Sequence, residues 1–167
     1  LQKHKEQEEE LRIKEDIFNI LVKDAEMDPP ESVIDRELKF MIEGMKFQIA
    51  QSGMKHEDSG FEPEKAIKEW REKAVFNTTG YMMLESIAAA ENIHLTQQDM
   101  EGEYELLAKQ TKQKVEEVQK RIMSNPDSLG QTTIKLLGQK AMNFIYSNCE
   151  IEFYKEGEEP EKTKEAL

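Results

Sequence analysis

The stretch that decides the fold is Val75 to Ala90, VFNTTGYMMLESIAAA. When it is wound as a helix at about 100° per residue, Val75, Met83 and Ile87 share one side and Leu84 lies on another. A helix that is apolar nearly all round must be surrounded by other parts of the protein. We therefore expect a central helix here, with Leu84 and Ile87 in the core.

The residues that follow predict that this helix ends and that another helix begins a few residues later. Asn92 is suited to the left-handed position that ends a helix. Thr96 then caps the next helix, with Asp99 supplying the carboxylate of a capping box, and Leu95 with Met100 can form a hydrophobic staple. A sharp helical corner is expected at this point.

The remaining apolar patterns predict further helices joined by short polar turns. One helix is expected over residues 3–24, a second from Pro30 to Ser52, and a third from Pro63 through the central stretch to Glu91, about 44 Å at 1.5 Å per residue. Others are expected over residues 96–109, near residues 115–122, and from Ser128 onward. Two of them should each present one apolar face, and these faces comprise Leu11, Ile17, Phe18 and Leu21 in the first helix and Leu129, Ile134, Leu137, Ala141, Phe144 and Ile145 in the last.

The second helix carries two apolar stripes about 100° apart. The larger stripe consists of Ile34, Leu38, Met41, Met45 and Ile49. The smaller stripe consists of Val33, Phe40 and Phe47. One neighbouring helix cannot cover both, so the smaller stripe is either an exposed binding patch or a surface that another element covers.

Three stretches resemble a known family. The run MLESIAAAENIHLTQQDMEGEYELLA over residues 83–108 is similar to the C-terminal domain of trigger factor, the bacterial ribosome-associated chaperone. PESVIDRE at residues 30–37 and KAMNFI at residues 140–145 agree in order, so the resemblance spans roughly residues 10–153. The chain departs from the family in a shorter segment between Gly53 and Pro63, and in Thr78, where the family tends to have an aliphatic residue. The matching positions of the first run are Leu84, Ile87, Ala88, Glu91, Ile93 and Thr96.

The resemblance implies an all-α, elongated domain of helical hairpins or arms, of the trigger factor C-terminal or SurA-like peptide-binding type. This domain is expected over residues 1–154, followed by an acidic tail at residues 155–167 that has too little apolar surface to fold. Leu1 is not an initiator methionine, and the sequence enters in mid-helix. We therefore expect a piece of a longer protein, with the family's ribosome-docking domain and FKBP-like prolyl isomerase domain upstream.

For function, the resemblance implies a cytoplasmic, ATP-independent chaperone domain that holds unfolded or nascent polypeptides on apolar surfaces. The ribosome would be a partner only through the absent N-terminal domain, and a homodimer is left open. The alternative is a helical scaffold or oligomerisation domain that binds one fixed protein partner. The nine methionines suit a surface that adapts to many sequences, although each one is more ordinarily a core filler. The expected client-binding residues are Val33, Phe40, Phe47, Met41 and Met45.

The composition speaks against several other functions. A net charge of −12 is unsuited to nucleic acid, which needs a basic face. No apolar run approaches the ~20 residues of a membrane span. His4, His56 and His94 lack the spacing of metal ligands, and Cys149 is the one cysteine. No nucleophile signature or glycine-rich phosphate loop is evident. We therefore expect no catalytic residue, no cofactor and no metal ion, and we do not expect this chain itself to be an enzyme.

Overall fold

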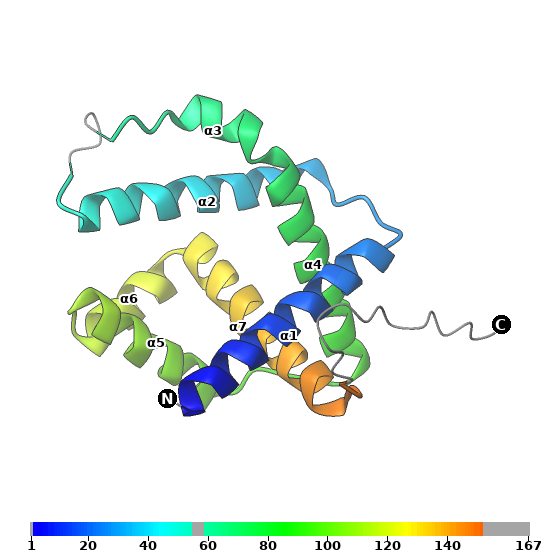
Figure 1. The fold of residues 1–167 in the computed structure, drawn as a ribbon. Helices are drawn as coiled ribbons and strands as arrows, with labels where there is room; N and C mark the ends of the chain where they lie inside the picture. The colour runs from blue at the N-terminus through cyan, green and yellow to red at the C-terminus, as the bar shows by residue number, and fades with distance from the viewer. Residues whose placement is uncertain (1, 55–58, 152–167) are drawn as a thin grey trace.

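A computed structural model describes residues 2–54 and 59–151, and Figure 1 shows their arrangement. The described residues form helices and their connections, with no strand among them. The all-α prediction is therefore confirmed. The predicted acidic tail at residues 155–167 lies outside the described residues. The helices are α1 (Gln2–Asp24), α2 (Glu31–Gln51), α3 (Pro63–Glu69), α4 (Arg71–Ala90), α5 (Gln97–Thr111), α6 (Val115–Ser124) and α7 (Pro126–Asn148).

The central helix of the fold is α4, which packs against α1, α2, α3 and α7. Leu84 is 3% exposed and Ala88 is 1% exposed, and both pack against α7 at Ala141 and Met142. The predicted core position of Leu84 is confirmed. Ile87 is half-buried, so it lies at the edge of this core.

The first helix reaches α4 through one close approach. An added Cβ at Gly80 would collide with the ring of Phe18, so only glycine at this position lets α1 come so near. The Phe18 ring also meets Phe76 and Tyr81 edge to face, with centroids 5.6 and 6.0 Å away. Leu11 was expected on the same buried face, and that prediction is wrong. It is 67% exposed, because α1 crosses the body obliquely (Figure 1) and packs on the core through Ile17, Phe18 and Leu21, further along the helix.

The predicted unbroken helix from Pro63 to Glu91 is also wrong, because the chain bends at Trp70. Its φ of −95° and ψ of 0° separate α3 from α4. Trp70 stacks on Phe61 with ring centroids 5.7 Å apart and joins the core between α2 and α4. The bend therefore packs the half-buried Trp70 side chain between α2 and α4 and lays α3 along α2.

Two helical hairpins extend from the body formed by α1, α4 and α7 (Figure 1). A cluster that includes Ile34, Leu38 and Ala74 attaches α2 of the α2–α3 hairpin to α4. The hairpin of α5 and α6 has its own cluster, in which Val118 is fully buried. The prediction of a domain built from helical hairpins is confirmed.

The helical corner after α4 has the predicted chemistry. Asn92 is left-handed with a φ of 54°, and its N–H donates to the Ala89 carbonyl at 3.3 Å. The N–H of Ile93 donates to the Ala88 carbonyl at 2.8 Å, which completes the pattern of a left-handed helix end. At the start of α5 the side chains and backbone of Thr96 and Asp99 form a reciprocal capping box. The staple of Leu95 and Met100 stays a prediction.

One lysine ties this corner to α7. Lys140 Nζ lies 2.7 Å from Asp99 Oδ2 and donates to the His94 carbonyl at 3.0 Å. The hydrogen bond from Lys140, followed by those from the backbone and side chain of Thr96, lowers the pKa of Asp99 to about 2. The carboxylate therefore fixes the corner both locally and from a distant helix.

Two helix starts differ slightly from expectation. Pro30 is the cap residue of α2 instead of part of its first turn. The last helix begins at Pro126, two residues before the predicted Ser128, because the Asn125 side chain accepts hydrogen bonds from the N–H groups of Asp127 and Ser128 at 3.0 and 3.2 Å.

Candidate functional site

The two apolar stripes of α2 have opposite surroundings. On one side, Ile34 and Leu38 are each 3% exposed and pack against α4. On the other side, Phe40 and Phe47 are 53% and 51% exposed, so about half of each side chain is open to solvent. We call the first side the closed side. The residues Val33, Phe40, Gly44 and Phe47, which share a face at helical spacing, are called the open stripe.

The five residues that the sequence predicts to bind clients divide between these two sides. Val33, Phe40 and Phe47 belong to the open stripe, and Val33 is half-buried at its beginning. Met41 packs with Trp70 against the closed side, and Met45 is half-buried. A ligand on the open stripe would therefore meet the two aromatic rings directly, while Met41 lies on the closed side with only part of its side chain accessible.

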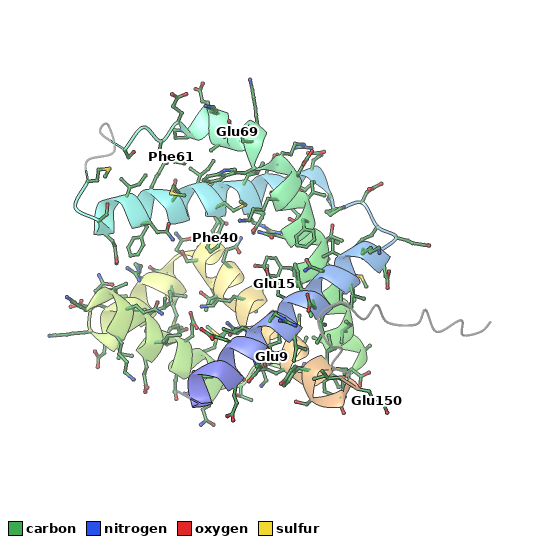
Figure 2. All side chains as sticks on the ribbon, in the orientation of Figure 1. Glu9, Glu15, Phe40, Phe61, Glu69 and Glu150 are labelled. Atoms are coloured by element: carbon green, nitrogen blue, oxygen red, sulfur yellow. The ribbon has the colours of Figure 1, made fainter. Side chains whose placement is uncertain are left out.

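The open stripe begins at a cleft between α2, α4 and α7. The cleft has a volume of about 120 Å³. Val33 belongs both to the cleft and to the stripe, which continues along α2 on the side where Figure 2 shows Phe40, facing α6 and α7. The lining residues are Val33, Arg36, Glu37, Thr78, Tyr81, Met82, Glu85, Gln131 and Ile134.

The walls of the cleft contain polar groups, which differ in whether they have a hydrogen-bond partner. Glu37, at 8% exposed, accepts a hydrogen bond from Asn77 Nδ2 at 2.9 Å. Burial raises the pKa of the Tyr81 phenol, and the charge of Glu37 raises it further. Thr78 is 3% exposed, and its hydroxyl has no hydrogen-bond partner within the part of the chain that the structure describes. An unpartnered buried hydroxyl weakens the fold unless something else satisfies it.

The charges beside the open stripe are paired with each other. Lys46 Nζ lies 2.8 Å from Glu43 Oε1, and this hydrogen bond is the main cause of a lowered pKa for Glu43. Lys39 Nζ lies 3.8 Å from Asp127 Oδ2 at the start of α7. The two exposed rings therefore lie among charges that already have partners.

Sequence reasoning missed several other exposed apolar side chains. Met123 on α6 is 59% exposed, Leu106 on α5 is 47% exposed, and Ile67 on α3 is 45% exposed. Met123 follows the buried Ile122 directly, so a helical-wheel reading of α6 places it off the buried face. That signal was present in the sequence, but it does not by itself distinguish a binding residue from an isolated surface methionine.

Residues 2–54 and 59–151 contain neither a candidate metal site nor a candidate membrane-spanning helix. No group of three or more His, Cys, Asp or Glu side chains in these ranges is placed to hold a metal ion. None of the helices in the same ranges combines the length and apolar character needed to cross a bilayer. The site that the described residues do form is an apolar surface with an adjoining cleft.

The fold and this surface define an all-α domain with two hairpin arms and an unpaired apolar stripe on one arm. A family model described as the bacterial trigger factor protein C-terminus matches residues 1–147. The chain therefore belongs to the trigger factor C-terminal family, as the sequence resemblance indicates.

Individual relatives agree with this assignment. The chain is 24% identical over 139 residues to the trigger factor of Geobacter sp. strain M21, which covers 83% of this chain and 32% of that protein. It is 27% identical over 153 residues to the trigger factor of Bacillus thuringiensis strain Al Hakam, which covers 89% of this chain and 35% of that protein. The chain thus spans about a third of the length of these relatives.

A solved structure shows the same fold. It comes from a study of the domains of trigger factor from Thermotoga maritima, and it matches with a TM-score of 0.56 at 17% sequence identity. The match covers 84% of this chain and 83% of that chain. At this level of identity the likeness concerns the fold alone.

Proposed function

We propose that this chain is the client-holding domain of an ATP-independent chaperone, and that unfolded or nascent polypeptides bind to the open stripe of α2. The observation that carries the proposal is the exposure of Phe40 and Phe47, at 53% and 51%, on a helix whose other side buries Ile34 and Leu38 against α4. Membership of the trigger factor C-terminal family supports a chaperone-related role. The helical chaperone unit is proposed to span residues 1–154.

The proposed mechanism is reversible burial of apolar surface. Two exposed aromatic rings on one helical face offer area that water solvates poorly, and a client segment gains free energy by covering them. Contacts of this kind typically give weak affinity in the micromolar range, ~8 kcal/mol of binding free energy. Such binding withholds the client from aggregation and still releases it on the timescale of folding, with no covalent step.

The wider setting is part of the same proposal. We place the protein in the cytoplasm, with unfolded and nascent polypeptides as partners and any ribosome contact made by a different part of a longer protein. A prolyl isomerase activity, if the longer protein has one, would belong to a separate domain. None of the described residues of this chain is assigned a catalytic role.

The test compares two double variants in an aggregation assay with several unrelated clients and no ATP. Phe40→Ser with Phe47→Ser removes the rings of the open stripe. Leu11→Ser with Ile20→Ser removes two other exposed apolar side chains, 67% and 58% exposed on α1, and serves as the matched control. We expect the first variant to lose most of its aggregation suppression at an unchanged thermal midpoint, while the control keeps both properties.

The outcome also separates this function from the scaffold alternative. A chaperone should protect several clients of unrelated sequence, and all of them should depend on Phe40 and Phe47. Suppression that survives the loss of both rings, or a wild-type chain that protects none of the clients, would contradict the proposal. A chain that protects none of them but binds a single folded partner tightly would favour the scaffold.

A further inference from the structure

We propose that this surface selects extended client segments whose large apolar side chains lie four residues apart, one received at Gly44 and the other in the cleft at the start of the open stripe. The proposal rests on the proposed function and adds a spacing rule to it. It follows from a gap in the middle of the stripe and from the position of the cleft on the same helix.

The gap is at Gly44. An added Cβ there would meet no atom within 4 Å, and the residue does not have the positive φ that would require glycine. Phe40 and Phe47 lie about one turn away on either side and share its face. Glycine also weakens a helix relative to alanine. Neither the backbone nor internal packing therefore explains Gly44, but a notch between two exposed rings does.

A comparison with Gly80 supports the interpretation of Gly44 as a notch. At Gly80 the ring of Phe18 occupies the place of the missing side chain, so that glycine serves packing inside the domain. Gly102 in α5 and Gly130 in α7 are also open to added atoms. Neither of those two is flanked by half-exposed aromatic rings on both sides of its own face. Gly44 is thus the open helical glycine whose surroundings suit an apolar guest.

The second anchor is the cleft. From α2 it is lined by Val33, Arg36 and Glu37, whose mean position is about nine residues before Gly44. At 1.5 Å per residue this places the α2 wall of the cleft about 13 Å from the notch along the helix axis. An extended chain advances about 3.3 Å per residue, so about four residues cover the distance. An even number of residues also brings both side chains to the same side of the extended chain.

The surroundings suit an uncharged, apolar guest. The cleft contains the charged residues Arg36, Glu37 and Glu85, but Val33, Met82 and Ile134 give it apolar walls. The charges that flank the stripe are already paired, Lys46 with Glu43 at 2.8 Å and Lys39 with Asp127 at 3.8 Å. They therefore attract neither sign of charge strongly. A cleft of about 120 Å³ has room for one large side chain. An unfolded segment with two such side chains matches these features.

The test uses three uncharged peptides of about twelve residues and identical composition, rich in glycine and serine. Each carries two phenylalanines, at positions i and i+2, i and i+4, or i and i+6. Dissociation constants for the wild-type chain are measured by titration. We expect the i and i+4 peptide to bind about tenfold tighter than the other two, because only this peptide can bury both rings at once.

Two variants assign the preference to the notch. Gly44→Leu fills the gap without displacing a neighbour, so the domain should stay folded and bind the three peptides within about twofold of one another. Gly102→Leu adds the same side chain at an equally open helical position in α5 and should keep the wild-type preference. Equal binding of the three peptides by the wild-type chain, or a preference that survives Gly44→Leu, would overturn the spacing rule.

Failure of the spacing rule is distinguishable from failure of the chaperone function. If the wild-type chain binds none of the peptides, the rule is overturned, while aggregation suppression and its dependence on Phe40 and Phe47 still decide the proposed function. If those rings prove irrelevant to suppression, the proposed function itself is contradicted, whatever the peptides do.

Discussion

The closed side and the open stripe of α2 consist of similar apolar residues, but the first is packed inside the domain and the second is exposed. Leu38 is 3% exposed and Phe40, two positions further on, is 53% exposed. Both are large and apolar, and both lie in the middle of a regular helix. The difference lies in the neighbours, because α4 and Trp70 cover one side of the helix while about half of each phenylalanine side chain on the other is open to solvent.

This difference shows which apolar residues maintain the fold and which remain available for binding. Burial of Ile34 and Leu38 anchors the α2–α3 hairpin to the body. Phe40 and Phe47 contribute little to that anchoring, because folding removes only part of their apolar surface from water. A substitution on one side of α2 should therefore change stability, and one on the other side should change binding.

The largest effect is expected from Leu38→Ala on the closed side. Removal of a fully buried leucine side chain should cost ~2–5 kcal/mol of unfolding free energy, because apolar burial is lost and a cavity remains. Denaturant unfolding measures this change. Aggregation suppression per folded molecule should be unaltered at a temperature where the variant is still folded. An unfolding curve identical to that of the wild-type chain would mean that the closed side does not hold the hairpin.

At the cleft, we expect a smaller change in the free energy of unfolding, and this change should be an increase. Thr78→Val keeps the shape of the side chain and removes a buried hydroxyl that has no partner among the described residues, so it should raise stability by about 1 kcal/mol. The matched control is Thr79→Val, because the Thr79 hydroxyl is also buried but donates to the Val75 carbonyl at 2.9 Å. The control should be neutral or destabilised. If Thr78→Val loses as much stability as Thr79→Val, the hydroxyl of Thr78 is satisfied after all.

The smallest expected effect on stability is at the corner between α4 and α5, which is far from the open stripe in sequence. The pKa of Asp99 is lowered from 3.8 to about 2, so its stabilising contribution is present above about pH 4 and is lost as the pH falls towards 2. The difference in thermal midpoint between the wild-type chain and Asp99→Asn should shrink over this range. A difference that stays constant between these pH values would show that the ionised carboxylate is not what stabilises the corner.

The sequence predicted the features that depend on local chemistry. The all-round apolar pattern of residues 75–90 identified the central helix, and Asn92, Thr96 and Asp99 marked the corner, because left-handed ends and capping boxes are made by adjacent residues. The bend at Trp70 and the exposure of Leu11 were not predicted. Both depend on how distant helices cross, and that geometry has no signature in a single segment.

The candidate site was predicted in part for the same reason. Helical spacing showed that α2 has two apolar stripes and that one neighbour cannot cover both. Spacing does not say which stripe is covered. It places Met41 in the larger stripe, and Met41 does pack with Trp70 on the closed side, so adding Met41 to the expected client-binding residues joined two different sides of the helix. The cleft was not predicted, because its walls come from α2, α4 and α7, which meet only in the folded chain.

The central claim is that clients contact the open stripe, and photo-crosslinking tests it most directly. A photoreactive phenylalanine analogue is placed at Phe47, which is 51% exposed, or at Leu11 on α1, a control that is 67% exposed, and each protein is irradiated with the same unfolded client. The structure predicts abundant client adducts from position 47 and only background from position 11. Equal adducts from the two positions, or fewer from position 47, would contradict the assignment of the open stripe as the client-binding surface.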